Sequence, residues 1–249
     1  MFSFFKKKQP SLTNIQGSFP FTTDIHSHIL PGIDDGSPNI ETSLELIKGL
    51  MQLGIKQSIA TPHIIGDMYR NNAQTINTAL QLLKTTLKEN NIDFKLHAAA
   101  EYMMDDYFIH LLETKTHLLT LKDNIVLTEF SYAEKPYNAK KMAFTLITEG
   151  YQPILAHPER YSYYHNNLKE YAELKDLGFL LQVNLLSLTG YYGKPVAIAA
   201  NYIIKNNLAS FTATDLHHDR HMQALSSTAN RAIFADVFKG KMMNEEMLF

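Results

Sequence analysis

Short apolar runs alternate with segments of helical periodicity along most of this chain. In the helical segments, apolar residues recur at three- and four-residue spacing, as at Ile76, Leu80 and Leu83, which is typical of amphipathic helices. The predicted helices are Thr42–Leu53, Ala73–Glu89, Ala139–Glu149, Leu168–Leu177, Pro195–Lys205 and a C-terminal helix from about Met222. The apolar runs have the length of buried strands. The predicted strands are Phe21–His28, Ile55–His63, Phe94–Glu101, Asn124–Phe130, Gln152–His157, Phe179–Asn184 and Ala209–Asp215.

This alternation predicts the fold class. Parallel strands need long crossover connections, which are usually helices, so the pattern indicates a parallel sheet. Seven such units predict an α/β fold with a closed or nearly closed seven-stranded (β/α) barrel, similar to a TIM barrel. An open doubly wound sheet is the alternative, but no Gly-rich phosphate loop follows the first predicted strand. We expect one domain over residues 21–249, preceded by a flexible tail over residues 1–20.

Composition limits the classes of function. The chain of 249 residues has a formal net charge of -2, which gives no electrostatic reason to expect nucleic acid as a partner. No apolar run approaches the roughly 20 residues needed to cross a bilayer. At the N-terminus, Phe2, Phe4 and Phe5 precede Lys6–Lys8, the reverse of the order in a signal peptide, so we expect a cytoplasmic protein. The sequence has no cysteine, which excludes a Cys nucleophile and leaves nitrogen and oxygen ligands for any metal.

The C-terminal ends of the predicted strands carry ionisable side chains. The first strand ends in His26 and His28, and their spacing of two places both on one face. Asp215 and His217 repeat this spacing after the last strand. The other strands end in His63, Glu101, Glu129, His157 and, for the sixth, Asn184. Each taken alone fits an ordinary hydrogen-bonded polar residue, but burying so many ionisable groups together is costly unless cations compensate them. We therefore predict a metal centre at the end of the barrel that carries active sites.

The number of candidate ligands bears on the number of ions. The candidates are His26, His28, His63, Glu101, Glu129, His157, Asp215 and His217, with Asp34 or Asp35 as a ninth. One ion cannot use all of them, so two or three divalent ions with bridging carboxylates fit better. Imidazole mixed with carboxylate suits Mn, Fe or Zn, and the ligand types do not choose among these metals.

Four motifs in fixed order resemble one known family. They are Asp24–Gly36, Ala60–His63, His157–Tyr161 and Asp215–His217. Together they are similar to the polymerase and histidinol phosphatase (PHP) superfamily, and more narrowly to the bacterial manganese-dependent tyrosine-protein phosphatases of capsule and exopolysaccharide operons. The resemblance runs from about Asp24 to past His221. It implies a distorted seven-stranded (β/α) barrel with a trinuclear metal site, with manganese as the expected metal.

The resemblance also implies roles for individual residues. It makes Asp35 the ninth ligand and Asp34 its neighbour, and it makes Glu129 the bridging carboxylate. Arg160 matches the phosphate-binding arginine, so Arg160, Glu129 and Asp35 are the expected catalytic residues. The nearest counterpart of the family's second arginine is Arg220, which comes slightly early. Its role therefore stays open between a phosphate contact and a surface ion pair.

Aromatic residues and the remaining histidines receive simpler interpretations. Tyr69 is predicted to belong to the rim that binds substrate. The stretch Tyr161–Tyr164 is expected to pack at the barrel rim rather than to form a wall for an aromatic substrate. His218 and His221 are expected to face solvent.

The predicted reaction is metal-dependent phosphomonoester hydrolysis. From the resemblance, the expected substrate is a phosphotyrosine-bearing protein, namely the Tyr-rich tail of a membrane-anchored bacterial tyrosine kinase. Three alternatives are a histidinol-phosphate or other small-molecule phosphatase, a metal-dependent nuclease or amidohydrolase-type barrel, and a catalytically silent, metal-stabilised binding module. The sequence leaves the physiological substrate, the native metal and the oligomeric state open.

Overall fold

The computed structural model describes residues 19, 21–237 and 242–248 of the chain. The tail expected over residues 1–20 lies outside the described residues except for Phe19, which is buried. None of the described helices is long and apolar enough to span a membrane.

The strands form two parallel sheets. The smaller sheet has the order β1 (Thr23–Asp24), β2 (Gln57–Ala60) and β4 (Lys95–Ala98). The larger sheet has the order β3 (His63–Ile64), β5 (Glu101–Met103), β6 (Ile125–Glu129), β7 (Gln152–Ala156), β8 (Leu180–Asn184) and β9 (Ala209–Ala213). All neighbouring strands pair in parallel, as the strand–helix alternation predicts. The count of seven strands is wrong, because the described residues form nine.

The difference arises because two predicted strands are each broken. The run Ile55–His63 forms β2 and β3, and Phe94–Glu101 forms β4 and the start of β5. Pro62 cannot donate to a strand ladder. Backbone bonds nevertheless cross both breaks, from the Ala99 N–H to the Ala60 carbonyl at 2.8 Å and from the Glu101 N–H to the Pro62 carbonyl at 3.1 Å. The two sheets therefore stay joined, and His63 lies in register with Glu101.

The first predicted strand is also shorter than expected, since β1 ends at Asp24. Its continuation bonds instead to the segment that follows β9. The Asp215 N–H donates to the His26 carbonyl, and the His28 N–H donates to the Leu216 carbonyl, both at 2.9 Å. These bonds bring the two motifs with period-two spacing, from opposite ends of the chain, side by side.

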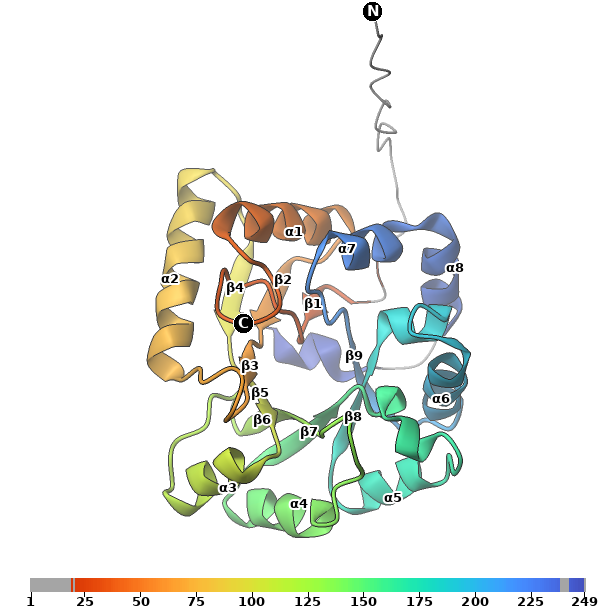
Figure 1. The fold of residues 1–249 in the computed structure, drawn as a ribbon. Coiled ribbons are helices and arrows are strands. Elements are labelled where there is room, and N and C mark those ends of the chain that lie inside the picture. Colours follow the sequence, from red (N-terminus) through yellow and green to blue (C-terminus); the bar gives the residue numbers. More distant parts are fainter. Residues whose placement is uncertain (1–18, 20, 238–241, 249) are drawn as a thin grey trace, which may run out of the picture.

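Helices surround the strands (Figure 1). They are α1 (Ile40–Gln52), α2 (Ala73–Glu89), α3 (Asp106–Glu113), α4 (Ala139–Thr148), α5 (Glu170–Asp176), α6 (Lys194–Lys205), α7 (Asp219–Ser226) and α8 (Thr228–Val237). The first helix begins where the Asn39 side chain accepts the Thr42 N–H, a typical N-cap. Helix α3 was not among the predicted helices. The single C-terminal helix predicted from Met222 is instead two, because Ser227 is extended between α7 and α8.

The core lies on both sides of the strands. A large cluster packs between the strands and the helices, and a smaller one lies among residues of the strands. The smaller cluster consists of Ile25, Ile59, Ala99, Leu121, Leu127, Ile154, Ala156, Phe211, Ala213 and Met247. Met247 belongs to the short 3-10 helix η4 (Met243–Met247). Its neighbour Asn244 donates to the carbonyls of Thr23 and Thr212, which fixes this C-terminal segment against β1 and β9.

Candidate metal centre and active site

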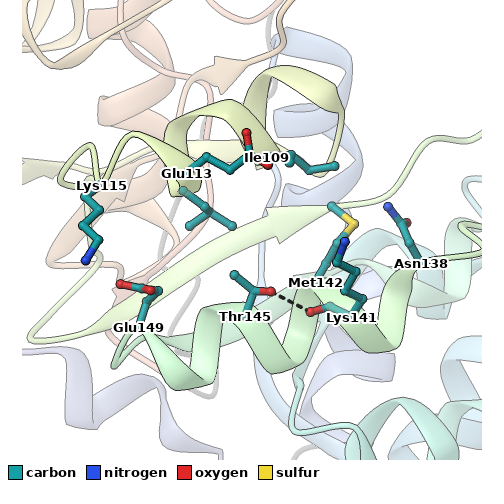
Figure 2. A pocket seen from close by; sticks show the side chains of 9 residues that line it. Ile109, Glu113, Lys115, Asn138, Lys141, Met142, Thr145 and Glu149 are labelled. Carbon is teal, nitrogen blue, oxygen red and sulfur yellow. Dashed lines mark hydrogen bonds between the residues drawn. The ribbon is translucent and has the colours of Figure 1, made fainter.

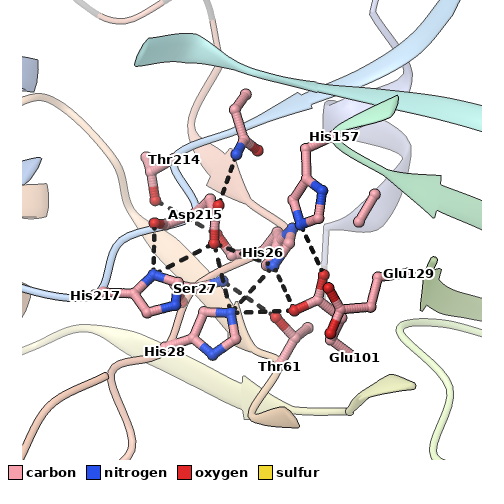
Figure 3. Close-up of polar contacts among 12 residues, drawn as sticks. His26, Ser27, His28, Thr61, Glu101, Glu129, His157, Thr214, Asp215 and His217 are labelled. Carbon is pink, nitrogen blue, oxygen red and sulfur yellow. Dashed lines mark hydrogen bonds and ion pairs between the residues drawn. The ribbon is translucent and has the colours of Figure 1, made fainter. Parts of the chain in front are cut away.

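Nine histidine, aspartate and glutamate side chains converge where the strands end. Figure 3 shows His26, His28, Glu101, Glu129, His157, Asp215 and His217. Four overlapping groups offer ligand atoms that lie within 4.8 Å of one another. The groups are His28–Asp35–His63–His217, His26–His28–Glu101, His26–His157–Asp215 and His63–Glu101–Glu129. Every ligand predicted from the sequence belongs to at least one group, so the structure brings all nine together.

His26 and His28 turn the same ring nitrogen toward the centre. Their Nε2 atoms lie 3.2 Å apart, and each lies within 3.4 Å of Glu101 Oε2. The Nδ1 atoms point away and have their own partners, Gln182 Oε1 at 2.8 Å for His26 and Asp34 Oδ2 at 2.7 Å for His28. Such partners orient ligand imidazoles in metal sites.

The two loop aspartates have different surroundings. Asp34 lies behind His28 and also accepts the N–H groups of Gly36 and His63. Asp35 is half-exposed, and its Oδ1 lies 3.5 Å from His63 Nε2 and 3.7 Å from His217 Nε2. Gly36 is required here because a Cβ at this position would lie only 2.0 Å from the His28 carbonyl oxygen. Asp35 is thus the loop aspartate that joins a candidate group.

Two of the candidate ligands have left-handed backbone conformations. His157 has φ 36° and Asp215 has φ 49°. A non-glycine residue in this region costs about 1–3 kcal/mol, and such residues cluster at functional sites. In this conformation His157 Nε2 lies 3.0 Å from Glu101 Oε1, and Asp215 Oδ1 lies 3.4 Å from His26 Nε2.

Three buried polar atoms of the cluster have no hydrogen-bond partner: His63 Nδ1, Glu101 Oε2 and Glu129 Oε1. They nevertheless face one another, because His63 Nδ1 lies 3.1 Å from Glu101 Oε2 and 3.0 Å from Glu129 Oε1. These contacts are short in distance but lack hydrogen-bond geometry. Unpaired buried polar atoms are rare and costly, and an imidazole nitrogen with two carboxylate oxygens is a suitable donor set for a divalent ion. The residues therefore fit the metal centre that the sequence predicts.

Burial and neighbouring charges shift the pKa values of several cluster members. Burial alone would raise the pKa of Glu101, but the charges of His26 and His63 outweigh it and hold the pKa well below its ordinary value. Burial and the neighbouring charge of Glu101 raise the pKa of Glu129. Burial and the charge of His28 lower the pKa of His217 to about 3. A cluster in which like groups titrate so differently is typical of a functional site.

A pocket of about 280 Å³ opens onto this cluster. Besides cluster members, its lining includes Tyr132, Arg160, Tyr192, His218 and His221. Arg160 Nη1 donates to Asp215 Oδ2 at 3.0 Å. The guanidinium carbon of Arg160 lies 5.1 Å from the centre of the Tyr132 ring and 4.4 Å from that of Tyr192. The pocket thus combines acidic and imidazole ligands with one well-held guanidinium.

A second pocket of the same volume lies between α3 and α4 (Figure 2). Ile109, Leu112 and Met142 contribute apolar surface to it, and Glu113 and Lys115 are among its charged residues. None of the four candidate metal groups of the described chain includes a residue of this lining. Chemistry rather than size therefore identifies the pocket at the strand ends as the candidate active site.

Two residues predicted to bind substrate lie outside the lining of that pocket. The Tyr69 ring stacks on the His63 ring, with centroids 5.7 Å apart and an angle of 13° between the planes. Arg220 is exposed in the first turn of α7. Tyr69 thus reaches the edge of the cluster, whereas the structure does not bring Arg220 to it.

Some histidines and tyrosines next to the motifs lie where the sequence predicts, and others do not. His221 was expected to face solvent, but it is 7% exposed and its Nδ1 lies 3.1 Å from the Asp215 carbonyl. The short helix α7 turns it inward. His218 is exposed at the pocket mouth. Tyr161 and Tyr164 are buried, which agrees with packing. Sequence reasoning missed Tyr132 and Tyr192, because both follow strand ends in loops without a recognisable motif.

The sequence of this chain matches a known protein family. Residues 22–242 match the model of the family described as "Capsular polysaccharide synthesis, CpsB/CapC". The chain belongs to the CpsB/CapC family. Its relatives include two that are more than 30% identical to it. A putative tyrosine-protein phosphatase CapC from Staphylococcus aureus is 32% identical over 194 residues, covering 78% of this chain and 76% of the relative. The tyrosine-protein phosphatase YwqE from Bacillus subtilis is 33% identical over 198 residues, covering 78% and 77%.

Solved structures agree with this assignment to CpsB/CapC. A chain from crystal structures of YwqE from Bacillus subtilis and CpsB from Streptococcus pneumoniae, described as unique metal-dependent tyrosine phosphatases, matches with a TM-score of 0.74. It is 28% identical, and the match covers 86% of this chain and 92% of that chain. The lactonase Lmo2620 from Listeria monocytogenes matches with a TM-score of 0.50 at 11% identity, which shows a shared fold alone.

Proposed function

We propose that this chain is a metal-dependent tyrosine-protein phosphatase with a role connected to capsular polysaccharide. One observation carries the proposal: nine imidazole and carboxylate side chains converge at one centre, and seven of them line the same pocket as the Arg160 guanidinium. The names of the CpsB/CapC relatives supply the phosphotyrosine substrate. A phenol has a pKa of about 10, so the leaving group of a phosphotyrosine needs less protonation than an alkyl alkoxide.

We propose two or three divalent ions as cofactors, with manganese first and iron or zinc as alternatives. The nine residues of the four groups would hold them. His26, His28, His63 and Glu101 each belong to two groups, which supports neighbouring ions with shared ligands. When bound, such ions would lower the pKa of an attacking water and offset charge on the phosphoryl oxygens. Glu129 as the bridging carboxylate stays a prediction, and the double membership of Glu101 supports Glu101 for that role as well.

The chain's own residues would bind and orient the phosphoryl group. Arg160 has N–H groups that Asp215 does not engage, and a guanidinium can bind two phosphoryl oxygens at once. Tyr132 and Tyr192 would keep its plane fixed from the pocket wall. Tyr69 stays a prediction for the rim that binds substrate, and Arg220 stays open between a phosphate contact and a surface ion pair.

We also propose a protein partner, a cellular location and a barrel fold for this chain. We propose the Tyr-rich tail of a bacterial tyrosine kinase as the substrate, met in the cytoplasm. We infer also that residues 21–249 form one domain and that the two sheets are parts of one distorted barrel. The bonds between the segments around His26–His28 and Asp215–Leu216 support closure of that barrel.

A substrate panel tests the proposal. Manganese-loaded protein would be given a phosphotyrosine peptide, the matched phosphoserine peptide, histidinol phosphate and single-stranded DNA, with phosphate release or strand cleavage measured. We expect rapid turnover of the phosphotyrosine peptide alone. Turnover of histidinol phosphate alone would assign a small-molecule phosphatase, and cleavage of DNA would assign a nuclease. No turnover of any substrate by protein with bound manganese would leave the silent binding module.

A further inference from the structure

Strand β8 differs from its neighbours in what it brings to the centre. It lies between β7, which precedes His157, and β9, which precedes Asp215. Its inward side chains are the amides of Gln182 and Asn184, which belong to none of the candidate metal groups in the described chain. Both residues are completely buried. The presence of two uncharged amides within a cluster of ionisable groups requires a physical explanation.

The two amides connect His26 to Asp215 through a continuous chain of hydrogen bonds. Asn184 Nδ2 donates to Asp215 Oδ2 at 2.6 Å. Gln182 Nε2 donates to Asn184 Oδ1 at 2.8 Å. Gln182 Oε1 lies 2.8 Å from His26 Nδ1. His26 and Asp215 are members of the same candidate group with His157.

The direction of every bond in this chain is fixed by its first member. An ionised carboxylate only accepts hydrogen bonds, so Asp215 requires the NH₂ end of the Asn184 amide. The Asn184 oxygen then faces Gln182 and requires its NH₂ end. The Gln182 oxygen in turn faces His26 and requires a proton on Nδ1. Any other arrangement would bring two donors or two acceptors together, at the cost of unpaired buried groups.

This order leaves His26 Nε2 as the ligand atom. Nε2 lies 3.2 Å from Glu101 Oε2, 3.2 Å from His28 Nε2 and 3.4 Å from Asp215 Oδ1, where the other ligand atoms converge. We propose that Gln182 and Asn184 are positioning residues that fix the tautomer of His26 and the orientation of Asp215, and so set the metal affinity of the His26–His157–Asp215 group. The inference rests on the proposed metal centre and not on the identity of the substrate.

The chain of amides is itself anchored. Glu159, which is completely buried, accepts the Asn184 backbone N–H at 2.9 Å and the Ser187 hydroxyl at 2.7 Å through Oε1. Glu159 directly precedes Arg160, whose Nη1 shares Asp215 Oδ2 with Asn184. One carboxylate oxygen thus receives both the positioned amide and the phosphate-binding arginine, while the other faces the histidines.

The tautomer can be observed without any substitution. In a histidine ¹H–¹⁵N NMR spectrum of the Zn²⁺-loaded full chain, His26 is expected to carry its proton on Nδ1 and the ion on Nε2. The reverse assignment would overturn the proposal. Failure of the wild-type chain to bind Zn²⁺ or Mn²⁺ would overturn the metal centre itself, a result distinct from failure of the positioning role.

A substitution at Gln182 measures how much the amide contributes to metal affinity. Gln182→Met keeps the length of the side chain but removes both of its hydrogen bonds, and loss of such a partner typically weakens metal binding by about 10–100-fold. The matched control is Gln57→Met, a buried glutamine whose amide bonds the Met247 carbonyl in η4. We expect weaker Mn²⁺ binding, measured by titration of stripped protein, in the first variant only. A Mn²⁺ affinity within twofold of wild type for Gln182→Met, or an equal loss of affinity in Gln57→Met, would contradict the positioning role. The two amides would then only fulfil each other's hydrogen-bonding requirements.

Discussion

Arg160 and Asp215 are joined by a hydrogen bond of 3.0 Å from Nη1 to Oδ2, at the wall of the pocket that holds the candidate ligands. The arginine side chain is 25% exposed and the aspartate is buried. The bond joins the proposed phosphate-binding group to a member of a candidate metal group. If Arg160 binds the phosphoryl group as proposed, this bond would fix the distance between substrate and metal centre before substrate arrives.

Replacing this arginine should damage catalysis far more than replacing the other candidate. We expect Arg160→Ala to lower kcat/KM for a phosphotyrosine peptide by about 100–1,000-fold, the usual cost of removing one donor to a developing charge. Arg220→Ala is the comparison that decides its open role. Arg220 is exposed and outside the pocket lining, so if it forms only surface contacts, its replacement should change kcat/KM by less than about threefold. Equal losses in the two variants would contradict the assignment of Arg160 as the principal phosphate contact.

The Tyr192 ring beside Arg160 should matter through its face rather than its hydroxyl group. A cation–π contact contributes about 0.5–2 kcal/mol, so Tyr192→Leu should raise KM by roughly 2–30-fold with a smaller change in kcat. Tyr192→Phe keeps the ring and should behave like wild type. The KM and kcat of both variants would be measured on one phosphotyrosine peptide. A Phe variant as impaired as the Leu variant would refute the contribution of the ring face.

Metal uptake should release protons near neutral pH. In the metal-free protein, burial lowers the pKa of His26, but the carboxylates of Glu101 and Asp215 outweigh it and raise the pKa to about 9. Below that pH the imidazole is protonated, and a bound ion must displace the proton. Mn²⁺ affinity should therefore rise with pH from about 7 to about 9. Calorimetric titration in two buffers of different ionisation enthalpy measures the protons released, and none at about pH 8 would disprove the shift.

The C-terminal segment should stabilise the fold without taking part in metal binding. Met247 is 1% exposed within the smaller core cluster, and truncation of a buried methionine costs about 2–5 kcal/mol. We expect Met247→Ala to lower the free energy of unfolding by that amount in denaturant titrations, with Mn²⁺ affinity unchanged. The control Met68→Ala, at a side chain 69% exposed, should shift stability by no more than about 0.5 kcal/mol. A large loss of Mn²⁺ affinity in Met247→Ala would show that the segment supports the metal centre after all.

The sequence predicts much of this arrangement because parallel strands converge at one end. His26 and His28 needed only the period of two along a strand to be placed together. His63 and Glu101 needed only their position at the end of an apolar run. The CpsB/CapC family and its relatives confirm the resemblance found in the motifs.

Other features depend on tertiary contacts that no local pattern contains. The left-handed conformations of His157 and Asp215 are imposed by the surrounding structure, since propensity disfavours them. His221 is buried because α7 turns toward Asp215, which spacing alone does not reveal. Tyr132 and Tyr192 meet across Arg160 although 60 positions separate them in the chain. Only the break at Pro62 had a local signal, the missing N–H of proline.

The most direct measurement is the rate of phosphate release from a phosphotyrosine peptide as Mn²⁺ is added back to chelator-stripped protein. Glu101→Gln, which alters the carboxylate shared by two candidate groups, would be compared with Glu113→Gln in the second pocket. We expect no turnover by the stripped protein. In wild type and Glu113→Gln, the rate of phosphate release should recover and level off at two to three bound ions, whereas the rate of Glu101→Gln should not recover. Full turnover by stripped protein, or equal recovery in both variants, would contradict this expectation.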